Sequence, residues 1–203
     1  MPRLIEILLA VFSILLLSPV LLVAAIAVKF SSPGPIIFSH KRVGKNGAPF
    51  GVYKFRSMSV ATDNTGSSLT VGGDARVTRI GRVLRSSKID ELPQLFNVLF
   101  GTMSFVGPRP ETADLLAHYP EGPKAVMLSV RPGITDPASI MYRNEESELA
   151  AQDDPHAYYR DVIIGRKCDM YLDYIPRKSI GFDLKVIFQT IIAVLDKRGR
   201  LRS

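Results

Sequence analysis

The sequence lacks what several common classes of enzyme need. A single cysteine, Cys168, excludes an internal disulfide framework and a zinc site built from cysteines. No glycine-rich loop has Walker or Rossmann spacing, and no serine stands in a nucleophile elbow. The three histidines, His40, His118 and His156, lack the paired spacing of metal ligands. These absences argue against P-loop, Rossmann, zinc and α/β-hydrolase chemistry.

What is present is the composition of a folded, basic protein. Of 203 residues, 46% are hydrophobic and 22% are charged, with 15 glycines and 14 prolines. This excludes disordered, collagen-like and low-complexity classes and suits about one domain. Lys and Arg outnumber Asp and Glu by 26 to 19, a net charge of +7. The excess favours anionic partners, namely nucleic acid, phosphates or an anionic membrane surface.

The hydrophobic residues are concentrated near the N-terminus, where residues 7–28 contain no charge. A helix of this length crosses a hydrocarbon core of about 30 Å. A transmembrane helix is the simplest interpretation. A cleaved signal peptide is a second, because Ala25-Ile26-Ala27 resembles a cleavage site, but the run is longer than the usual apolar segment.

A third interpretation is a bent helix that enters and leaves by one leaflet. Ser18-Pro19 lies mid-run, where proline removes a helical hydrogen bond. As helices, the two halves would be about 18 and 15 Å long, too short to cross a bilayer. Basic residues lie beyond both ends, which suits a cytoplasmic location for both. The Ser18 hydroxyl could cap a backbone group freed at the break.

The remaining chain predicts short elements separated by strong breaks. Residues 36–42 and 50–56 flank an Asn-Gly turn and predict a β-hairpin, and the polar residues 60–75 predict a mobile loop. Helices are predicted at residues 78–84, 93–100, 111–118, 122–129, 145–151 and 155–174. The 93–100 helix ends at Gly101, and the segment 107–110 is rigid and non-helical.

An apolar stripe near the C-terminus has helical spacing and is wide enough for a core or for a membrane interface. Its residues are Leu184, Ile187, Phe188, Ile191, Ile192 and Leu195, opposite Asp183, Lys185, Gln189 and Thr190. Core packing is the ordinary interpretation. The basic residues Lys197, Arg198, Arg200 and Arg202 follow at once and strengthen the interfacial one.

The densest chemical signal is a run of bases that leads into an acidic pair. Arg76, Arg79, Arg82, Arg85 and Lys88 recur every third residue, a spacing that drifts around a helix, so we expect them to surround a site. Asp90 and Glu91 follow. An acidic pair at a helix start is usually a solvated cap, and Asp90 is a candidate N-cap for the next helix.

Among so many arginines, the acidic pair also has a chemical interpretation. We expect Asp90 to stay ionised, because a helix N-terminus and nearby arginines both lower the pKa of a carboxyl group. Such a carboxylate can ligate Mg²⁺ or attack a phosphorus atom. Arg109, between Pro108 and Pro110, would present a forked donor from stiff backbone, although it could instead pair with a structural acid.

Six motifs, taken together, point to one family. They are Ser18-Pro19; Lys54-Phe55-Arg56-Ser57-Met58; Arg76-Val77-Thr78-Arg79-Ile80-Gly81-Arg82 with Leu84-Arg85; Asp90-Glu91-Leu92-Pro93-Gln94 with Asn97; Val106-Gly107-Pro108-Arg109-Pro110; and Val130-Arg131-Pro132-Gly133-Ile134-Thr135. In this order and spacing, from about residue 3 to residue 195, the chain resembles the bacterial sugar transferases. These monotopic phosphoglycosyl transferases start glycan assembly on a polyprenyl phosphate carrier, and the chain looks like their minimal single-domain form.

The resemblance implies a two-step reaction. Asp90 would attack the proximal phosphate of a nucleotide diphosphosugar, releasing a nucleoside monophosphate, and polyprenyl phosphate would then take the phosphosugar from the enzyme. Glu91 would bind Mg²⁺ with Asp90 or orient it. Arg85 and Arg109 would hold phosphates, with Pro108 and Pro110 near the nucleotide. Lys54 and Arg56 are further phosphate candidates.

The resemblance also implies the architecture. Residues 1–30 would form a re-entrant membrane helix bent at Ser18-Pro19, and residues 31–203 an α+β, mostly helical catalytic domain with a small hairpin and interfacial amphipathic helices. That domain would lie on the cytoplasmic face of a bacterial inner membrane. Its partners would be a nucleotide diphosphosugar, polyprenyl phosphate and membrane lipid, not nucleic acid. We expect residues 60–75 and 136–160 to select the sugar.

A different class of function also fits the net charge. A non-catalytic, membrane-anchored scaffold could bind anionic lipid or nucleic acid through its basic surface. Its affinity would fall steeply with salt and would not depend on Asp90. This hypothesis does not account for an acidic pair among arginines.

Overall fold

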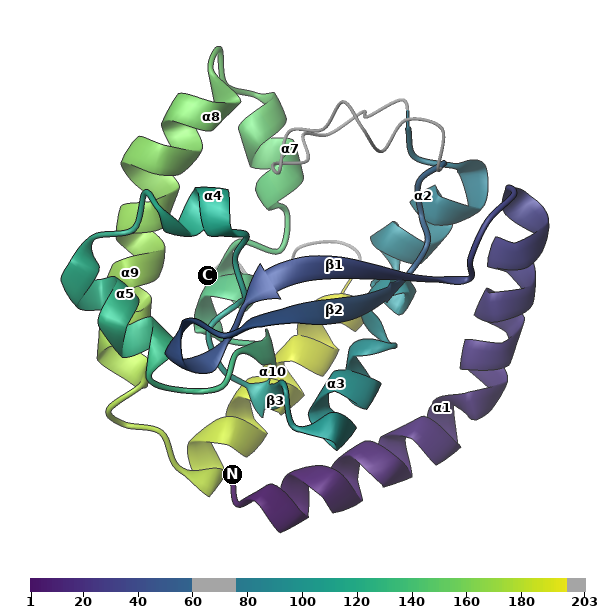
Figure 1. Cartoon of the computed structure of the whole chain (residues 1–203), viewed down its shortest axis with the longest axis horizontal. Coiled ribbons are helices and arrows are strands. Elements are labelled where there is room, and N and C mark those ends of the chain that lie inside the picture. Colours follow the sequence, from purple (N-terminus) through teal and green to yellow (C-terminus); the bar gives the residue numbers. More distant parts are fainter. Residues whose placement is uncertain (60–75, 197–203) are drawn as a thin grey trace.

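A computed structural model describes residues 1–59 and 76–196 (Figure 1). The loop expected at residues 60–75 and the basic residues expected at the C-terminus, Lys197, Arg198, Arg200 and Arg202, lie outside the described residues. The described part is mostly helical and contains a small antiparallel hairpin, which confirms these two features of the predicted fold class.

The hydrophobic run forms one long helix, α1 (Arg3–Ser31), with Pro19 inside it. It is the one described helix long and apolar enough to cross a membrane, by length and composition. Figure 1 shows that α1 changes direction part-way along its length. The Ser18 hydroxyl donates to the Leu15 carbonyl at 2.8 Å. Leu15 is four residues before Pro19, so its carbonyl is the one left without a helical donor, and the expected hydroxyl cap is present.

Both halves of α1 pack against the folded domain. Ala10 in the first half and Val28 near the end are fully buried, in two different hydrophobic clusters. Arg3 donates to the Leu99 carbonyl at 2.9 Å, and Arg56 donates to the Val28 carbonyl at 3.3 Å. The outward face is exposed at Leu4, Leu8, Phe12, Leu15, Leu16, Leu22, Val23, Ile26 and Phe30. The helix therefore lies along the domain and keeps an apolar outer face.

The predicted hairpin is present with strands shifted by about one residue. Strands β1 (Ile37–Val43) and β2 (Pro49–Phe55) are antiparallel, and Phe38 lies opposite Lys54. They are joined by η1 (Lys45–Gly47), in which Asn46 and Gly47 have φ of 57° and 77°. Asn and Gly tolerate this left-handed backbone, which is why the Asn-Gly pair forms the turn.

The predicted helices appear with small changes of boundary. The helices are α2 (Arg79–Ser86), α3 (Gln94–Phe100), α4 (Ala113–Leu116), α5 (Glu121–Leu128), α6 (Pro137–Met141), α7 (Glu145–Ala150), α8 (Pro155–Tyr158), α9 (Ile164–Tyr174) and α10 (Ile180–Leu195). Gly101, with φ of 87°, ends α3 as expected. The segment predicted as one helix at 155–174 contains a π-helical turn, η4 (Tyr159–Ile163), between α8 and α9. The short helix α6 was not predicted.

A second, unpredicted pairing joins segments far apart in the sequence. Strands β3 (Ser104–Val106) and β4 (Gly133–Thr135) are parallel, with Ser104 opposite Gly133. A Cβ atom on Gly133 would lie 2.1 Å from the Gly107 nitrogen, and one on Gly107 would lie 2.3 Å from the Arg131 carbonyl oxygen. Only glycine allows this approach. The pairing fixes the backbone that leads into Pro108-Arg109-Pro110.

Four of the six residues in the apolar stripe of α10 face away from the core, whereas Ile187 packs against it. Leu184, Phe188, Ile191 and Leu195 are exposed, while Asp183 and Val186 are buried against the domain. Thr190, on the side that was expected to be polar, hydrogen-bonds Thr135 at 2.7 Å. The ordinary interpretation, core packing of the stripe, is therefore wrong for these four residues, and α10 presents an apolar face outward.

Candidate active site

The acidic pair lies in a single 3-10 turn between α2 and α3. This turn, η3 (Ile89–Glu91), follows Lys88, whose φ of 57° is unusual for a residue with a side chain. Asp90 is 5% exposed. The N-cap of α3 is Pro93, without a side-chain cap, so the prediction that Asp90 caps this helix is wrong. The acidic pair Asp90-Glu91, called the dyad from here on, therefore lies in a tight turn before α3.

Glu91 is held by two of the predicted phosphate-binding residues. Lys54 Nζ, from β2, lies 2.7 Å from Glu91 Oε1, and Arg109 Nη2 lies 3.2 Å from the same oxygen. Three segments distant in sequence thus converge on one carboxylate oxygen. Arg109 does pair with an acid, as the alternative interpretation expected, but that acid is Glu91 of the dyad.

The pKa values of the Asp90 and Glu91 carboxyl groups are shifted in opposite directions. Burial raises the pKa of Asp90 to about 6, Glu91 adds to the rise, and Lys54, Lys88 and Arg85 oppose it. For Glu91, burial also favours the neutral form, but Lys54 and Arg109 outweigh burial and hold its pKa well below the usual range. The expectation that arginines keep the pKa of Asp90 low is wrong because desolvation and a neighbouring anion dominate.

The position of Lys54 depends on an asparagine of α3. Asn97 Oδ1 accepts a hydrogen bond from the Tyr53 amide at 2.9 Å, and Asn97 Nδ2 donates to the Gly51 carbonyl at 2.7 Å. The side chain thereby ties β2 to α3. Asn97 belongs to the acidic-pair motif, and these hydrogen bonds give it a physical role: they hold β2, the strand that carries Lys54, against the helix that follows Glu91.

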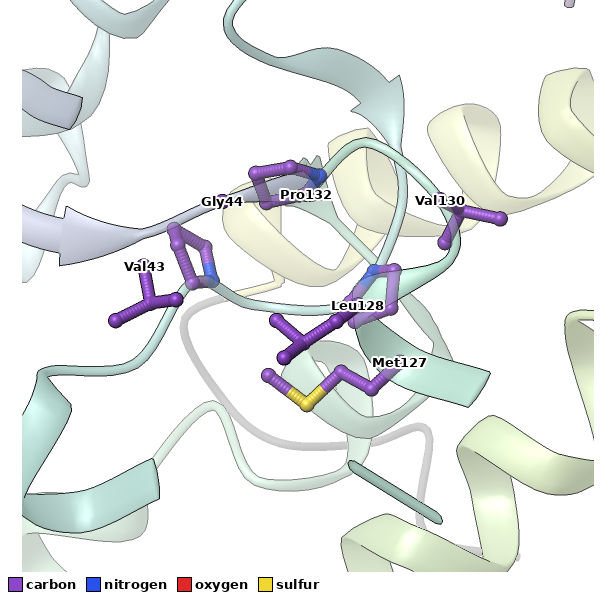
Figure 2. Close-up of a pocket in the computed structure, with 8 residues that line it drawn as sticks. Val43, Gly44, Met127, Leu128, Val130 and Pro132 are labelled. Carbon is purple, nitrogen blue, oxygen red and sulfur yellow. The ribbon is translucent and has the colours of Figure 1, made fainter. Parts of the chain in front are cut away.

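Two buried prolines fix Arg109. Pro108 and Pro110 are buried, and Arg109 between them is partly exposed. Both prolines line a small apolar cavity of about 10 Å³ together with Val43, Gly44, Met127, Leu128, Val130 and Pro132 (Figure 2). This volume is too small for a ligand, so the prolines act as packing residues here. They hold the backbone while the Arg109 side chain reaches the dyad.

The residue after this motif, Glu111, forms a buried network that the sequence did not indicate. Its carboxylate accepts hydrogen bonds from the hydroxyls of Tyr159 at 3.0 Å and Tyr119 at 3.2 Å. Arg42 Nη1 lies 3.6 Å and Lys167 Nζ 3.9 Å from it. Burial alone would raise the pKa of Glu111, but Lys167 and Arg42 outweigh it and lower it. The one signal was an acid directly after Pro-Arg-Pro.

The remaining predicted cations have different positions. Arg85 forms an ion pair with Glu146 of α7. Together with Lys88, it opposes the rise in the pKa of Asp90 that burial causes. Arg79 and Arg82 are exposed on α2. The run of bases therefore does not surround the dyad as a whole: its last two members act on Asp90.

Arg56 has a structural position. It is 5% exposed, and its guanidinium donates to the carbonyls of Val28, Ser32 and Pro35. Helices end with carbonyls that lack a donor, and Arg56 supplies donors to the end of α1 and the turn after it. Both terminal nitrogens, Nη1 and Nη2, donate to backbone carbonyls, so Arg56 is left out of the phosphate-binding set proposed below.

Comparison with known sequences assigns the chain to a family. The profile of the bacterial sugar transferases matches residues 1–197. The chain belongs to the bacterial sugar transferase family.

Individual relatives of this bacterial sugar transferase agree. It is 40% identical over 196 residues to a UDP-N-acetylgalactosamine-undecaprenyl-phosphate N-acetylgalactosaminephosphotransferase of Aeromonas hydrophila, covering 96% of this chain and 43% of the relative. It is 36% identical to a UDP-glucose:undecaprenyl-phosphate glucose-1-phosphate transferase of Caulobacter vibrioides, covering 95% and 69%. It is 38% identical to the exopolysaccharide production protein PSS of Rhizobium leguminosarum bv. phaseoli, covering 91% and 90%.

The coverage differs between relatives. The chain spans less than half the length of the first four curated relatives that it matches and 90% of the Rhizobium protein. In each of these five relatives the matched region covers more than 90% of this chain. The transferase domain is therefore what these proteins share.

The dyad has features that suit a divalent cation such as Mg²⁺. Asp90 Oδ1 is buried without a hydrogen-bond partner in the described part of the chain. Carboxylate oxygens are preferred ligands of Mg²⁺, which usually takes one or two of them and completes its shell with substrate phosphate and water. Within residues 1–59 and 76–196, no cluster of three His, Cys, Asp or Glu side chains could hold a metal alone. The residues thus fit a cation that binds together with a phosphorylated substrate.

Proposed function

We propose that this protein transfers a phosphosugar from a nucleotide diphosphosugar, with UDP-sugars as the expected class, to polyprenyl phosphate. The products are a polyprenyl diphosphosugar and UMP, in the first membrane step of glycan assembly. The names of the relatives support both substrate classes. The observation that carries the proposal is the buried Asp90, with one unpartnered carboxylate oxygen, beside a Glu91 that Lys54 and Arg109 hold.

In the first step, a carboxylate oxygen of Asp90 attacks the phosphorus that carries the sugar. A bond forms between this oxygen and phosphorus, the bond to the bridging oxygen breaks, and UMP leaves with that oxygen. In the second step, an oxygen of polyprenyl phosphate attacks the same phosphorus and releases the Asp90 carboxylate. Ionised Asp90 is the reactive form, and a raised pKa makes it a more basic nucleophile than an exposed carboxylate.

The charges around the dyad are suited to substrate phosphates. Lys54 and Arg109 already face an anion, Glu91, and a diphosphate would bring further negative charge to the same donors. Arg85 is a third cation near Asp90. Mg²⁺, held by Asp90 and Glu91 with substrate oxygens, would neutralise charge on the diphosphate.

The proposed location is the cytoplasmic face of a bacterial inner membrane. Both halves of α1 contact the domain, so a crossing of the bilayer would have to separate parts that pack together. A re-entrant α1 bent at Ser18-Pro19, with its apolar face in lipid and α10 at the interface, leaves these contacts intact. The dyad would then work near the headgroups, where the acceptor phosphate lies.

The proposed reaction can be tested through its first step, the transfer of the phosphosugar to the enzyme. Purified protein incubated with UDP-sugar and Mg²⁺, without acceptor lipid, is expected to release up to one UMP per chain and to gain the mass of one phosphosugar. Addition of polyprenyl phosphate should discharge the adduct, and chelation of Mg²⁺ should prevent its formation. Asp90→Asn should form no adduct, whereas Asp114→Asn, a change at an exposed residue of α4, should behave as wild type. An undiminished adduct in Asp90→Asn would exclude Asp90 as the nucleophile.

The same measurements distinguish the transferase proposal from the hypothesis of a non-catalytic scaffold. A scaffold would release no UMP, and its binding to anionic vesicles would be the same in wild type and Asp90→Asn. Nothing in the described contacts favours it. Binding that depends on salt alone, together with no turnover, would replace the transferase proposal.

Membrane topology is tested by cysteine labelling in cells. Pro2 is exposed at the start of α1, so Pro2→Cys is open to labelling, and a Cys168→Ala background removes the buried native thiol without adding a polar group to the core. Gly122→Cys, at a position with nothing near its Cβ, is the cytoplasmic control. A re-entrant helix requires that an impermeant reagent label neither cysteine in intact cells and both in inverted vesicles. Labelling of Pro2→Cys alone in intact cells would show a spanning helix.

A further inference from the structure

The hairpin carries an aromatic pair on the face that bears Lys54. Alternate residues of a strand share a face, so Phe38, His40 and Arg42 of β1 point to the same side. Lys54 lies opposite Phe38 in the register, which places it on that side as well. The ring centroids of Phe38 and His40 are 5.8 Å apart. Phe38 is 40% exposed, and the function proposed above makes no use of either ring.

The contacts of His40 define where its proton lies. Arg42 Nη2 is 3.2 Å from His40 Nδ1, and a guanidinium can only donate, so Nδ1 accepts. The proton of the neutral ring is then on Nε2, which is left as a donor. Burial, followed by Arg42 and Lys54, lowers the pKa of His40 to about 4, so the ring is neutral near pH 7. His40 therefore adds a neutral N–H donor to a site whose other donors are cations.

This donor is fixed close to the segment that presents Arg109. Arg42 also donates to the Pro110 carbonyl at 3.3 Å, so one guanidinium joins the imidazole to the Pro-Arg-Pro backbone. The Val43 amide donates to the Glu111 carbonyl at 2.9 Å and strengthens the same junction. His40 and Arg109 are therefore positioned by one rigid unit.

We propose that Phe38 and His40 bind the nucleobase of the nucleotide diphosphosugar, with Phe38 stacking on the base and His40 Nε2 donating to a carbonyl oxygen of a pyrimidine. The proposal rests on the transferase function given above. Phosphates prefer the cations Lys54 and Arg109, while a planar, uncharged base prefers an exposed aromatic face and a neutral donor. Uracil offers carbonyl acceptors, so this pair would contribute to selection of uridine nucleotides.

Nuclear magnetic resonance of histidine tests the contact directly. The chain has three histidines, so protein labelled at histidine gives few imidazole signals, and His40→Gln identifies those of His40. We expect UMP to shift the His40 signals and to leave those of His118 and His156 in place. Inorganic pyrophosphate should shift them much less. An equal response to pyrophosphate and UMP would make His40 part of the phosphate site and overturn the base assignment.

Binding of UMP is measured in parallel by equilibrium dialysis. If UMP and UDP-sugar bind but the His40 signals do not move, the base subsite is wrong and the transferase proposal stands. If neither ligand binds, both proposals fail. A shift of His40 caused by lipid vesicles instead of UMP would make the aromatic pair a membrane contact and would also overturn the proposal.

Kinetics separate a base contact from a structural effect. His40→Leu and Phe38→Leu should each raise the KM for UDP-sugar about tenfold, the effect of one lost hydrogen bond or stacking contact, with kcat changed less than about threefold. The KM for polyprenyl phosphate should not change. His40→Gln, which keeps a neutral N–H donor, should restore most of the affinity. His118→Leu, at an exposed position, is the matched control. Equal loss in His40→Gln and His40→Leu would contradict a donor role.

Discussion

Asp90 and Glu91 are adjacent in the chain, yet the pKa of the first carboxyl is raised to about 6 and that of the second is held well below its usual range. Both are largely buried, so burial raises both pKa values. The difference is that Lys54 and Arg109 contact Glu91 Oε1, whereas Asp90 Oδ1 has no partner among the described residues. Glu91 positions the two cations, and Asp90 keeps an oxygen without a partner. Nucleophilic attack on a phosphate requires this division, because the cations must offset the phosphate charge while the nucleophile stays available.

The first prediction is that Asp90 lowers the stability of the fold near neutral pH. Its pKa is higher in the folded chain than the usual 3.8, so the folded state binds more protons between about pH 4 and 6 and loses stability as pH rises through that window. The difference between 3.8 and about 6 corresponds to about 3 kcal/mol. Asp90→Asn should therefore raise the thermal midpoint at pH 8, with a smaller gain at pH 4.5.

Glu91→Gln is the matched control for this measurement. The pKa of Glu91 is lowered in the folded state, so removal of its charge leaves Lys54 and Arg109 unpaired and should lower the midpoint at pH 8. Thermal unfolding in detergent at the two pH values gives both comparisons. Midpoints that move in the same direction for the two variants would contradict the opposite pKa shifts.

The second prediction concerns the shared oxygen of Glu91. Lys54→Met and Arg109→Met should each lower kcat/KM for UDP-sugar by about 10- to 100-fold, since each removes a cation from the phosphate site. Both side chains contact Oε1, so their effects should be coupled, and the double variant should lose less than the product of the single losses. Lys124→Met, which removes a surface pair with Glu121 on α5, should have no effect. Independent, multiplicative losses would show that the two cations act at separate places.

The sequence predicts local features of this fold better than distant contacts. The Asn-Gly turn, the end of α3 at Gly101 and the hydroxyl contact at Ser18 depend on residues within a few positions, and all are present. The β3–β4 pairing and the Tyr119–Glu111–Tyr159 cluster could not be predicted because they depend on tertiary contacts. The same limit explains the error on Asp90, whose pKa is controlled by burial, a property of the whole fold.

The third prediction separates a structural arginine from a phosphate-binding one. Arg56→Met removes the donors to the carbonyls of Val28, Ser32 and Pro35, and should cost at least about 2 kcal/mol of unfolding free energy. The fraction that remains folded should keep the wild-type KM for UDP-sugar. Arg177→Met removes an exposed ion pair with Asp173 and an exposed hydrogen bond to the Asp173 carbonyl, and should change stability by less than about 1 kcal/mol. A raised KM with an unchanged thermal midpoint would return Arg56 to the phosphate site.

The fourth prediction tests the close approach of β3 and β4. In Gly133→Ala, the new Cβ would lie 2.1 Å from the Gly107 nitrogen and 2.5 Å from its carbonyl oxygen, both backbone atoms that cannot rotate away. The strands must separate, which moves the backbone before Pro108 and Arg109, so we expect a loss of more than about 3 kcal/mol or failure to fold. Gly165→Ala in α9 is the matched control, because nothing lies within 4 Å of its Cβ and alanine favours a helix by about 1 kcal/mol. Thermal midpoints should fall for the first variant and rise slightly for the second. If both variants keep the wild-type midpoint, the two strands are not held at the separation described here, and the fixed position of Arg109 needs another cause.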